Sequence, residues 1–374
     1  MNIPITKPFF DDAEANAVAE VLKSGWLVQG PKVKEFEEKF AQFVGAKHAI
    51  AVTSCTTALH LSLAALGIGE GDEVIVPAFT FVATANACEY QKAKPVFVDI
   101  DLRTFNIDPA KIEAAITPKT KAIIPVHLFG LSADMEPITA IAKKYNLKVI
   151  EDAACGFGSF YKNKHVGAFG DTGCFSLHPR KAITCGEGGV ITTNSDEAAE
   201  LLRSLRDHGS SMSDLARHKQ GLPMLPEYNR LGYNYRLTDL QGAVILEQMK
   251  KAEKILNERK RRAEIYDEAL KNSEKFKIPF VYDDSIHSYQ SYVLTMKSGA
   301  SRDEIADKLI KEGIGIRQGT HSVPHLGYYR QKYGYTDADF PNSFKAEKQT
   351  MTIPLFATMT DEEQRFVIQS LLAF

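Results

Sequence analysis

Short apolar runs alternate with longer amphipathic stretches through the first half of the chain. The apolar runs lie at 73–77, 95–99, 122–126 and 148–151. Apolar residues recur at helical spacing over 13–23, 32–43, 57–66, 82–91, 109–116 and 134–146. Short strands that alternate with helices predict a mostly parallel sheet covered by helices on both faces. The sequence therefore predicts an α/β fold.

The second half continues this alternation and then changes to a smaller α/β unit. The expected elements are a strand at 190–193, helices at 196–206 and 238–271, a strand at 289–296, and helices at 302–312 and 361–372. No repeat, low-complexity tract or flexible linker separates them. We expect a large domain over residues 1–245 and a small C-terminal domain over residues 246–374.

Composition and charge are those of an ordinary soluble globular protein. Of the 374 residues, 44% are hydrophobic and 25% are charged, and the formal net charge is −2. This balance gives no general attraction to nucleic acid or to anionic membranes. No apolar segment approaches the roughly 20 residues that a membrane span needs, and the N-terminus lacks the pattern of a signal peptide.

The cysteines and histidines argue against a disulfide framework and against a metal site. The five cysteines are odd in number and include no CxxC pair, which indicates reduced thiols in a cytoplasmic protein. His321 and His325 have the i, i+4 spacing of a zinc site, but Pro324 disfavours a helix across them. We expect no metal, nucleic acid or membrane partner.

Two charged residues follow buried strands, where the ligands of parallel α/β sheets bind. Asp152 comes at the end of the run 148–151, and Lys181 lies between Pro179 and a glycine-rich turn. Pyridoxal 5'-phosphate (PLP) requires a lysine amine for a Schiff base and a carboxylate that keeps its ring nitrogen protonated. Asp152 could instead be a satisfied buried carboxylate or a helix cap, so the prediction depends on the two residues together.

A cluster of hydroxyl side chains stands directly before the helix expected at 57–66. Residues 53–57 carry four hydroxyls, and Ser and Thr are the usual residues that cap a helix. The same residues could form a phosphate cup, in which hydroxyls and helix N–H groups hold the anion. Together with Lys181 and Asp152, the cluster favours the phosphate cup.

Further segments carry a resemblance to a known family. They are Ser24-Gly25-Trp26 with Gly30-Pro31, Gly71-Asp72-Glu73-Val74, Val126-His127-Leu128-Phe129-Gly130, Glu151-Asp152-Ala153-Ala154, Ser176-Leu177-His178-Pro179-Arg180-Lys181, Gly186-Glu187-Gly188-Gly189, Gly232-Tyr233-Asn234-Tyr235-Arg236 and Ile353-Pro354-Leu355-Phe356. Nearly the whole chain resembles the DegT/DnrJ/EryC1/StrS family of PLP-dependent nucleotide-sugar aminotransferases. The resemblance implies the fold-type-I architecture of aspartate aminotransferase, with a mixed, mostly parallel sheet in the large domain.

The resemblance also implies roles for the matching residues. Lys181 and Asp152 are expected to be catalytic, the first bonded to the cofactor and the second paired with its ring nitrogen. The other implied cofactor contacts are Phe81 against the ring, Thr56, Thr57 and Ser176 at the phosphate, and Asn234 at the phosphate of a neighbouring subunit. A homodimer with shared sites follows from the last contact. Cys155 departs from the family, because it stands where a glutamine often positions the cofactor's phenolic oxygen.

The implied reaction moves an amino group from glutamate to PLP, giving pyridoxamine phosphate, and then to a keto group of a nucleotide-linked deoxysugar. We expect a 4-keto-6-deoxyhexose as the acceptor, for surface glycan or related amino-sugar biosynthesis. The residues expected to line the substrate pocket are Trp26, His178, Arg317 and His321.

Two alternative functions are weighed against this one. A nucleotide-sugar dehydratase on the same fold typically has histidine in place of the Schiff-base lysine, whereas this chain keeps Lys181. A non-catalytic regulatory or binding homologue would have little reason to keep Lys181, Asp152 and the hydroxyl cluster together. The sequence therefore favours an aminotransferase.

Overall fold

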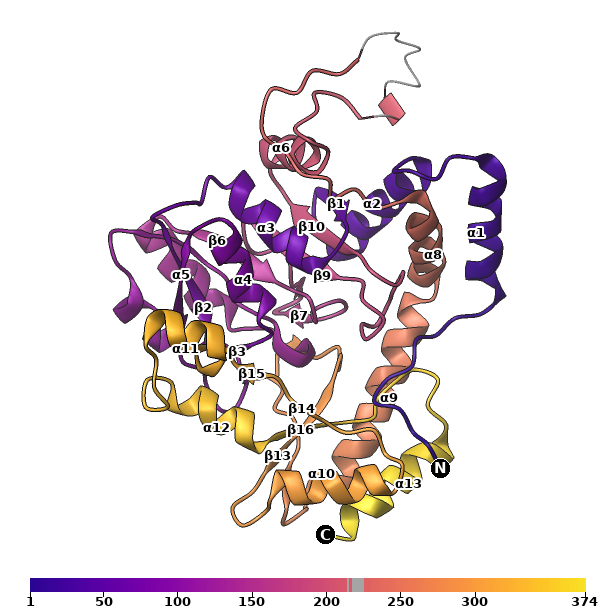
Figure 1. The fold of residues 1–374 in the computed structure, drawn as a ribbon. Coiled ribbons are helices and arrows are strands. Elements are labelled where there is room, and N and C mark those ends of the chain that lie inside the picture. Colours follow the sequence, from indigo (N-terminus) through magenta and orange to yellow (C-terminus); the bar gives the residue numbers. More distant parts are fainter. Residues whose placement is uncertain (214, 217–224) are drawn as a thin grey trace.

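The computed structural model describes residues 1–213, 215–216 and 225–374, and within them a seven-stranded sheet forms the centre of the fold (Figure 1). Its strand order is β1-β10-β9-β6-β5-β2-β4. Neighbours from β9 to β4 are parallel, whereas β10 is antiparallel to both β9 and β1. The bounds are β1 (His48–Val52), β2 (Glu73–Pro77), β4 (Lys94–Val98), β5 (Thr120–Ile123), β6 (Lys148–Asp152), β9 (Thr172–Ser176) and β10 (Gly189–Thr193). The predicted α/β fold with a mostly parallel sheet is confirmed.

Helices cover both faces of this sheet because successive side chains of its strands are apolar and point to opposite faces. Ile50 and Val52 pack with α3 and α6, while Ala49 and Ala51 pack with α2 on the other face. The helices of this unit are α1 (Asp12–Ser24), α2 (Pro31–Val44), α3 (Cys55–Ala65), α4 (Ala83–Tyr90), α5 (Met135–Tyr145), α6 (Asp196–Arg206) and α8 (Asp239–Lys250).

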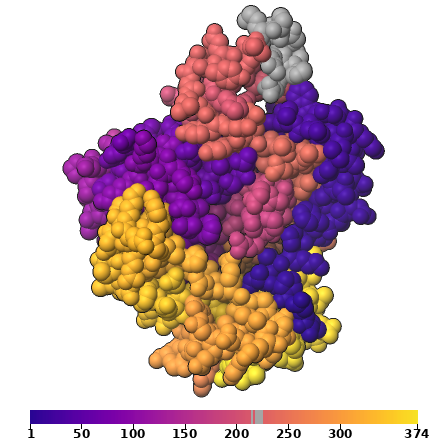
Figure 2. Space-filling view, in the orientation of Figure 1, coloured from indigo at the N-terminus to yellow at the C-terminus, as the bar shows by residue number. Residues whose placement is uncertain are grey.

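A second, antiparallel sheet lies in the C-terminal part of the chain, in the strand order β11-β13-β16-β14. Its elements are β11 (Phe276–Lys277), β13 (Tyr292–Met296), β14 (Arg317–Gln318) and β16 (Thr350–Ile353), with α9 (Ala252–Leu270), α10 (Arg302–Lys311) and α13 (Asp361–Leu372). Ile3 pairs with Ile314 and is fully buried in the core of this unit. Figure 2 accordingly shows the first residues lying against the C-terminal unit. The domain boundary near residue 245 stays a prediction.

Short elements connect the two units. β15 (His321–Ser322) pairs with β3 (Phe79–Thr80), so the C-terminal part of the chain reaches the end of β2. Tyr329 and Phe340 belong to the core of the large unit. The remaining short elements are α11 (Gly327–Tyr333), α12 (Pro341–Gln349), β7 (Phe160–Tyr161), β8 (Lys164–His165), β12 (Ser285–Ile286), η1 (Pro109–Lys111), η2 (Glu113–Ala115), η3 (Leu128–Gly130) and η4 (Val323–His325).

Three predicted elements are wrong in detail. Residues 109–116 form only two 3₁₀ turns, because Ile116 is already extended ahead of Thr117 and Pro118. The helix expected at 238–271 breaks into α8 and α9 at Lys251. The strand expected at 289–296 begins only at Tyr292. Among the described residues, no helix combines the length and the apolar composition required to cross a bilayer.

Candidate active site

A cavity of about 710 Å³ lies at the carboxyl ends of the parallel strands, between the large unit and the C-terminal unit. Asp152 ends β6, Ser176 ends β9, and Phe81 follows β3. The C-terminal unit contributes β14, β15 and the end of β16. The residues expected from the sequence that line this cavity are Thr56, Phe81, Asp152, Cys155, Ser176, His178, Lys181, Arg317 and His321.

Asp152 places a buried carboxylate at one side of the cavity. Its side chain is held by Thr84, whose hydroxyl donates to Oδ2 at 2.7 Å, and by the backbone N–H of Ala154, which donates to Oδ1 at 3.1 Å. Burial raises the pKa of Asp152, and the two hydrogen bonds and the charge of Lys181 oppose this rise. The carboxylate is therefore positioned by neutral donors, and its negative charge would be stabilised by a cation inside the cavity.

Lys181 lies on the turn that follows β9. The turn is closed by a hydrogen bond from the Lys181 N–H to the carbonyl of His178, at 2.8 Å. Its Nζ donates to Sγ of Cys155 at 3.2 Å, and the side chain is half-buried. Lys181 and Asp152 thus line one cavity, and they are close enough for the amine to lower the pKa of the carboxyl group.

The start of α3 forms a helix cap and also borders the cavity, while its role as a phosphate cup stays a prediction. Ser54 is the N-cap, and the Thr57 hydroxyl accepts from the Ser54 N–H at 3.0 Å, so Thr57 completes a capping box. Thr57 does not line the cavity, whereas Ser54 and Thr56 do. The first N–H groups of a helix have no acceptor within it, so this end of α3 can receive an anion. Gly189 allows the close packing, since a Cβ there would lie 2.3 Å from the Ser54 carbonyl oxygen.

Phe81 offers an open aromatic face. It is 57% exposed although it lines the cavity, and exposed aromatic side chains in a cavity commonly stack on a ligand ring. Ser176 is half-buried at the end of β9. These positions suit a flat ring between Lys181 and Asp152.

Two other expected residues lie away from the cavity. Asn234 is exposed, in a segment that bridges to Asp207, and Trp26 packs at the start of α2, where its Nε1 donates to the carbonyl of Gln29 at 3.4 Å. The roles predicted for Thr57, Asn234 and Trp26 therefore have no support from this cavity.

Comparison with known proteins agrees with the geometry. The sequence model described as "DegT/DnrJ/EryC1/StrS aminotransferase family" matches residues 8–372. The chain belongs to this family. The family, the fold type and the enzyme class expected from the sequence are thereby confirmed.

Three relatives illustrate the match. The chain is 42% identical to the spore coat polysaccharide biosynthesis protein SpsC of Bacillus subtilis (strain 168), over 98% of this chain and 96% of the relative. Helicobacter pylori PseC, an aminotransferase involved in the biosynthesis of pseudoaminic acid, has a similar structure, with 30% identity, a TM-score of 0.92 and coverage of 100% of this chain and 99% of PseC. Spr1654 of Streptococcus pneumoniae, solved in its PMP-form, is 28% identical, with a TM-score of 0.92 and coverage of 100% and 97%.

Next to Asp152, a buried network that sequence reasoning missed supports this aminotransferase site. Glu151 and His127 are fully buried, and their carboxylate and Nε2 atoms are 2.9 Å apart. His127 accepts the Ala133 N–H at Nδ1, so its proton resides on Nε2 and is donated to Glu151. Backbone N–H groups of residues 167, 169 and 170 also donate to Glu151. The network fixes the end of β6. The sequence signal that could have revealed this network is a polar pair, His127 and Glu151, at the ends of the apolar runs 122–126 and 148–151.

Replacing Glu151 with alanine should lower the free energy of unfolding by about 3–5 kcal/mol, because it leaves several buried donors without an acceptor. Burial raises the pKa of Glu151, but the His127 and backbone donors outweigh burial and hold the pKa below its ordinary value. The stabilisation is therefore present above the unfolded pKa of about 4.3 and is lost as the pH falls through the lower folded value. Urea titrations at several pH values measure both effects.

Glu136 provides the matched control for Glu151. Its side chain is 69% exposed and forms a surface ion pair with Lys162, so Glu136→Ala should cost less than about 1 kcal/mol. Equal losses for the two variants would contradict the role of the buried network.

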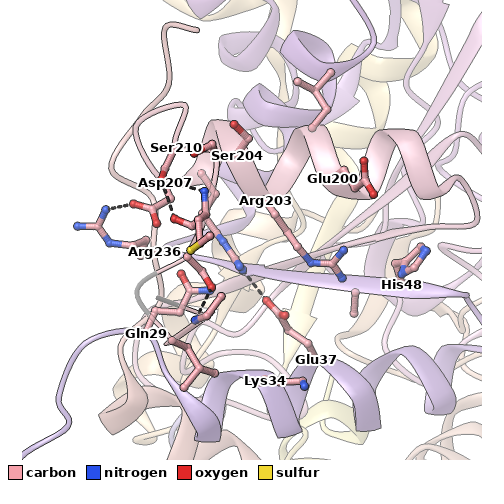
Figure 3. Close-up of a pocket in the computed structure, with 18 of the residues that line it drawn as sticks. Gln29, Lys34, Glu37, His48, Glu200, Arg203, Ser204, Asp207, Ser210 and Arg236 are labelled. Atoms are coloured by element: carbon pink, nitrogen blue, oxygen red, sulfur yellow. Dashed lines mark hydrogen bonds and ion pairs between the residues drawn. The ribbon is translucent and has the colours of Figure 1, made fainter. Parts of the chain in front are cut away.

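A larger cavity of about 1070 Å³ lies elsewhere, between α2, α6 and the segment after α6 (Figure 3). Four of its charged side chains form ion pairs, Arg206 with Glu37 and Arg236 with Asp207. None of the residues that the sequence assigned to cofactor or substrate lines it. The candidate chemistry therefore belongs to the smaller cavity.

Proposed function

We propose that the chain transfers an amino group from glutamate to a keto group of a nucleotide-linked deoxysugar, with PLP as its cofactor. The observation that carries the proposal is that the Lys181 amine and the buried Asp152 carboxylate line one cavity at the carboxyl edge of the sheet. The relatives agree in chemistry, since PseC is an aminotransferase and Spr1654 has been solved in both PLP- and PMP-forms.

The described residues fit PLP. Lys181 would bond to its aldehyde carbon, Asp152 would face its ring nitrogen, and Phe81 would cover its ring. Thr56, Ser176 and the start of α3 would hold its phosphate. When bound, the cofactor supplies an electron sink for the bond-breaking step.

The side chains around the ring then have separate tasks. Lys181 Nζ takes the proton from Cα of the donor and later returns a proton to the sugar carbon that receives the amine. Asp152 keeps the ring nitrogen protonated, and Thr84 orients Asp152. Cys155 accepts a hydrogen bond from Lys181 Nζ and so helps to aim the amine.

The finer parts of the proposal follow the family resemblance. The acceptor is a 4-keto-6-deoxyhexose, and His178, Arg317 and His321 contact the reactants. The working unit is a homodimer in the cytoplasm, in which Asn234 of each chain reaches the neighbouring site. The exposure of Asn234 is compatible with such a contact.

The decisive experiment supplies the PLP-loaded enzyme with glutamate and a panel of keto-sugar nucleotides. The panel varies the nucleotide (UDP, dTDP or GDP) and the keto position (C3 or C4), and mass spectrometry detects the product. Replacement of the keto oxygen by an amine is expected. Deoxygenation without gain of nitrogen would indicate a dehydratase, and no product with any member of the panel would contradict catalysis on keto-sugars.

A further inference from the structure

The segment between β12 and β13 borders the cavity around Lys181. We call residues 287–291 the strap, and its last two residues, Gln290 and Ser291, line the cavity. The strap lies against Gly130 of η3, where a Cβ would lie 2.6 Å from Oγ of Ser288 and 2.9 Å from the N atom of Gln290. The strap is therefore packed tightly against the large unit.

A buried cation holds the strap from the C-terminal unit. Arg259 of α9 is 2% exposed, and burial lowers its pKa to about 10, so the guanidinium stays charged at neutral pH. Its Nη2 donates to the carbonyls of Tyr289 and Gln290 at 2.9 and 2.5 Å, and its Nε donates to that of Tyr289 at 3.2 Å. Tyr289 has a φ of +48°, a left-handed conformation that is costly for a residue other than glycine. These bonds to a strained residue indicate that the position of the strap is closely specified.

The strap is bonded to both sides of the contact between Lys181 and Cys155. Nε2 of Gln290 donates at 2.9 Å to the carbonyl of Arg180, the residue directly before Lys181. Oγ of Ser288 donates at 3.3 Å to the carbonyl of Cys155. Lys181 Nζ in turn donates to Cys155 Sγ at 3.2 Å. One segment thus holds the backbone beside the amine and the backbone of the residue that the amine contacts.

The side-chain amide of Gln290 has a defined orientation. Its Oε1 accepts a hydrogen bond from Oγ of Ser291 at 3.2 Å, and its Nε2 faces the Arg180 carbonyl, which can only accept. The turn itself is closed by local bonds, since His178 accepts the N–H groups of Lys181 and Arg180. Gln290 therefore adds to this local turn a hydrogen bond from the C-terminal unit.

We propose that Gln290 positions the Lys181 amine through the Arg180 carbonyl; this inference rests on the proposed function and deepens it. Arg259 holds Gln290 in place. Lys181 Nζ moves a proton in both half-reactions, and proton transfer requires the reacting atoms to come within hydrogen-bond distance. The lysine stem is flexible, so the place of its turn decides where Nζ spends its time. Gln290 thereby makes proton transfer depend on how the C-terminal unit packs on the large unit.

The alternative is that Gln290, which lines the cavity, binds a reactant directly. The two roles predict different kinetics. A group that binds a reactant changes the apparent affinity for it, whereas a group that positions the amine changes the rate of the step once the reactant is bound.

The test follows both half-reactions of cofactor-loaded Gln290→Met by visible absorption. Methionine is of similar length but has no N–H to donate. At saturating glutamate the rate should fall by about 3–10-fold because one hydrogen bond is lost, and the apparent affinity for glutamate should change by less than about twofold. The PMP-form should lose as much with the keto-sugar nucleotide found in the panel, since Lys181 acts in both half-reactions. A fall in affinity with an unchanged saturated rate would assign Gln290 to the reactant and overturn the inference.

The resting PLP-form gives a readout that needs no turnover. The pH midpoint of its absorption depends on how the Lys181 nitrogen is held, so Gln290→Met should shift this midpoint by about half a pH unit. Gln290→Glu cannot donate at neutral pH, but its protonated form can. Relative to the unmodified enzyme at the same pH, its rate should therefore recover as the pH falls towards the ordinary glutamate pKa of about 4.3. An unchanged midpoint in Gln290→Met would count against positioning.

A double-mutant cycle separates positioning from a general structural role. In Lys181→Ala, ethylamine added at high concentration can act as the base, and Gln290→Met should cause no further loss there, because the side chain that it positions is gone. Equal losses in both backgrounds would indicate a structural role and overturn the inference. Gln331→Met, at an exposed glutamine of α11 outside the cavity, should behave as the unmodified enzyme. If no keto-sugar reacts, the proposed acceptor fails, while the glutamate half-reaction and the absorption midpoint still test Gln290.

Discussion

Replacement of Lys181 by alanine should abolish the visible absorption of the lysine-bound cofactor and reduce turnover by about 10⁴-fold or more. Both effects are expected because one nitrogen, Nζ, anchors the cofactor and carries the proton. Among the described residues that line the cavity, Lys181 is the only lysine, so no other amine can substitute for it. Spectra of the purified protein with added PLP, followed by turnover assays, test both expectations.

Lys277 provides the matched control for Lys181. It is exposed on β11, remote from the cavity, and Lys277→Ala should leave spectrum and turnover unchanged. Reduction with borohydride followed by peptide mass analysis should place the cofactor on the peptide that contains Lys181. A spectrum that survives in Lys181→Ala would contradict the assignment of this lysine.

The central parts of the site could be predicted because they are local in sequence. Asp152 directly ends a buried strand, and Lys181 follows Pro179 in a recognisable turn. Because the carboxyl ends of parallel strands lie at the same edge of a sheet, the two residues could be expected at one edge from the sequence alone. Both were therefore accessible from single short segments.

The supporting contacts could not be predicted, because they join segments that are far apart in the chain. The Thr84 hydroxyl, which also pairs with that of Thr80, holds Asp152 from 68 positions away in the chain. Likewise, Nε2 of Gln290 donates a hydrogen bond to the carbonyl of Arg180, which lies 110 positions away in the chain. Neither contact follows from periodicity, since both depend on how strands and helices pack in three dimensions.

In the fold, too, elements that depend on a local pattern were predicted, whereas contacts between distant segments were not. The apolar runs at 73–77 and 148–151 are strands as predicted, because such runs suit a sheet buried on both faces. Two-residue strands such as β14 and β15 are too short to produce a pattern. The burial of Ile3 in the C-terminal core requires pairing with Ile314, which no local pattern reveals.

Asp152→Asn should reduce turnover by about 10³-fold while the protein still binds PLP. The asparagine is isosteric and can still accept the Thr84 hydrogen bond, but it has no charge to keep the ring nitrogen protonated. Single-turnover absorbance with glutamate measures the proton-abstraction step directly. An unchanged rate would show that the carboxylate does not act on the ring.

Asp267→Asn separates this electrostatic effect from the general consequences of neutralising a half-buried carboxylate whose pKa is raised. Asp267 accepts from the Tyr292 hydroxyl at 2.6 Å, lies outside the cavity, and also has a pKa raised mainly by burial, so its variant should keep full turnover.

The stability of the protein provides an independent test of the charge on Asp152. Because burial raises its folded pKa, the cofactor-free protein should lose stability as the pH rises from the unfolded value of about 3.9 through the folded value. Asp152→Asn should remove that loss and so be the more stable cofactor-free form at neutral pH. Saturating PLP should stabilise the unmodified protein more than the variant, since only the carboxylate gains a cationic partner from the ring. Thermal unfolding of both proteins with and without PLP tests this reversal, and a parallel response to the cofactor would contradict the pairing of Asp152 with the ring nitrogen.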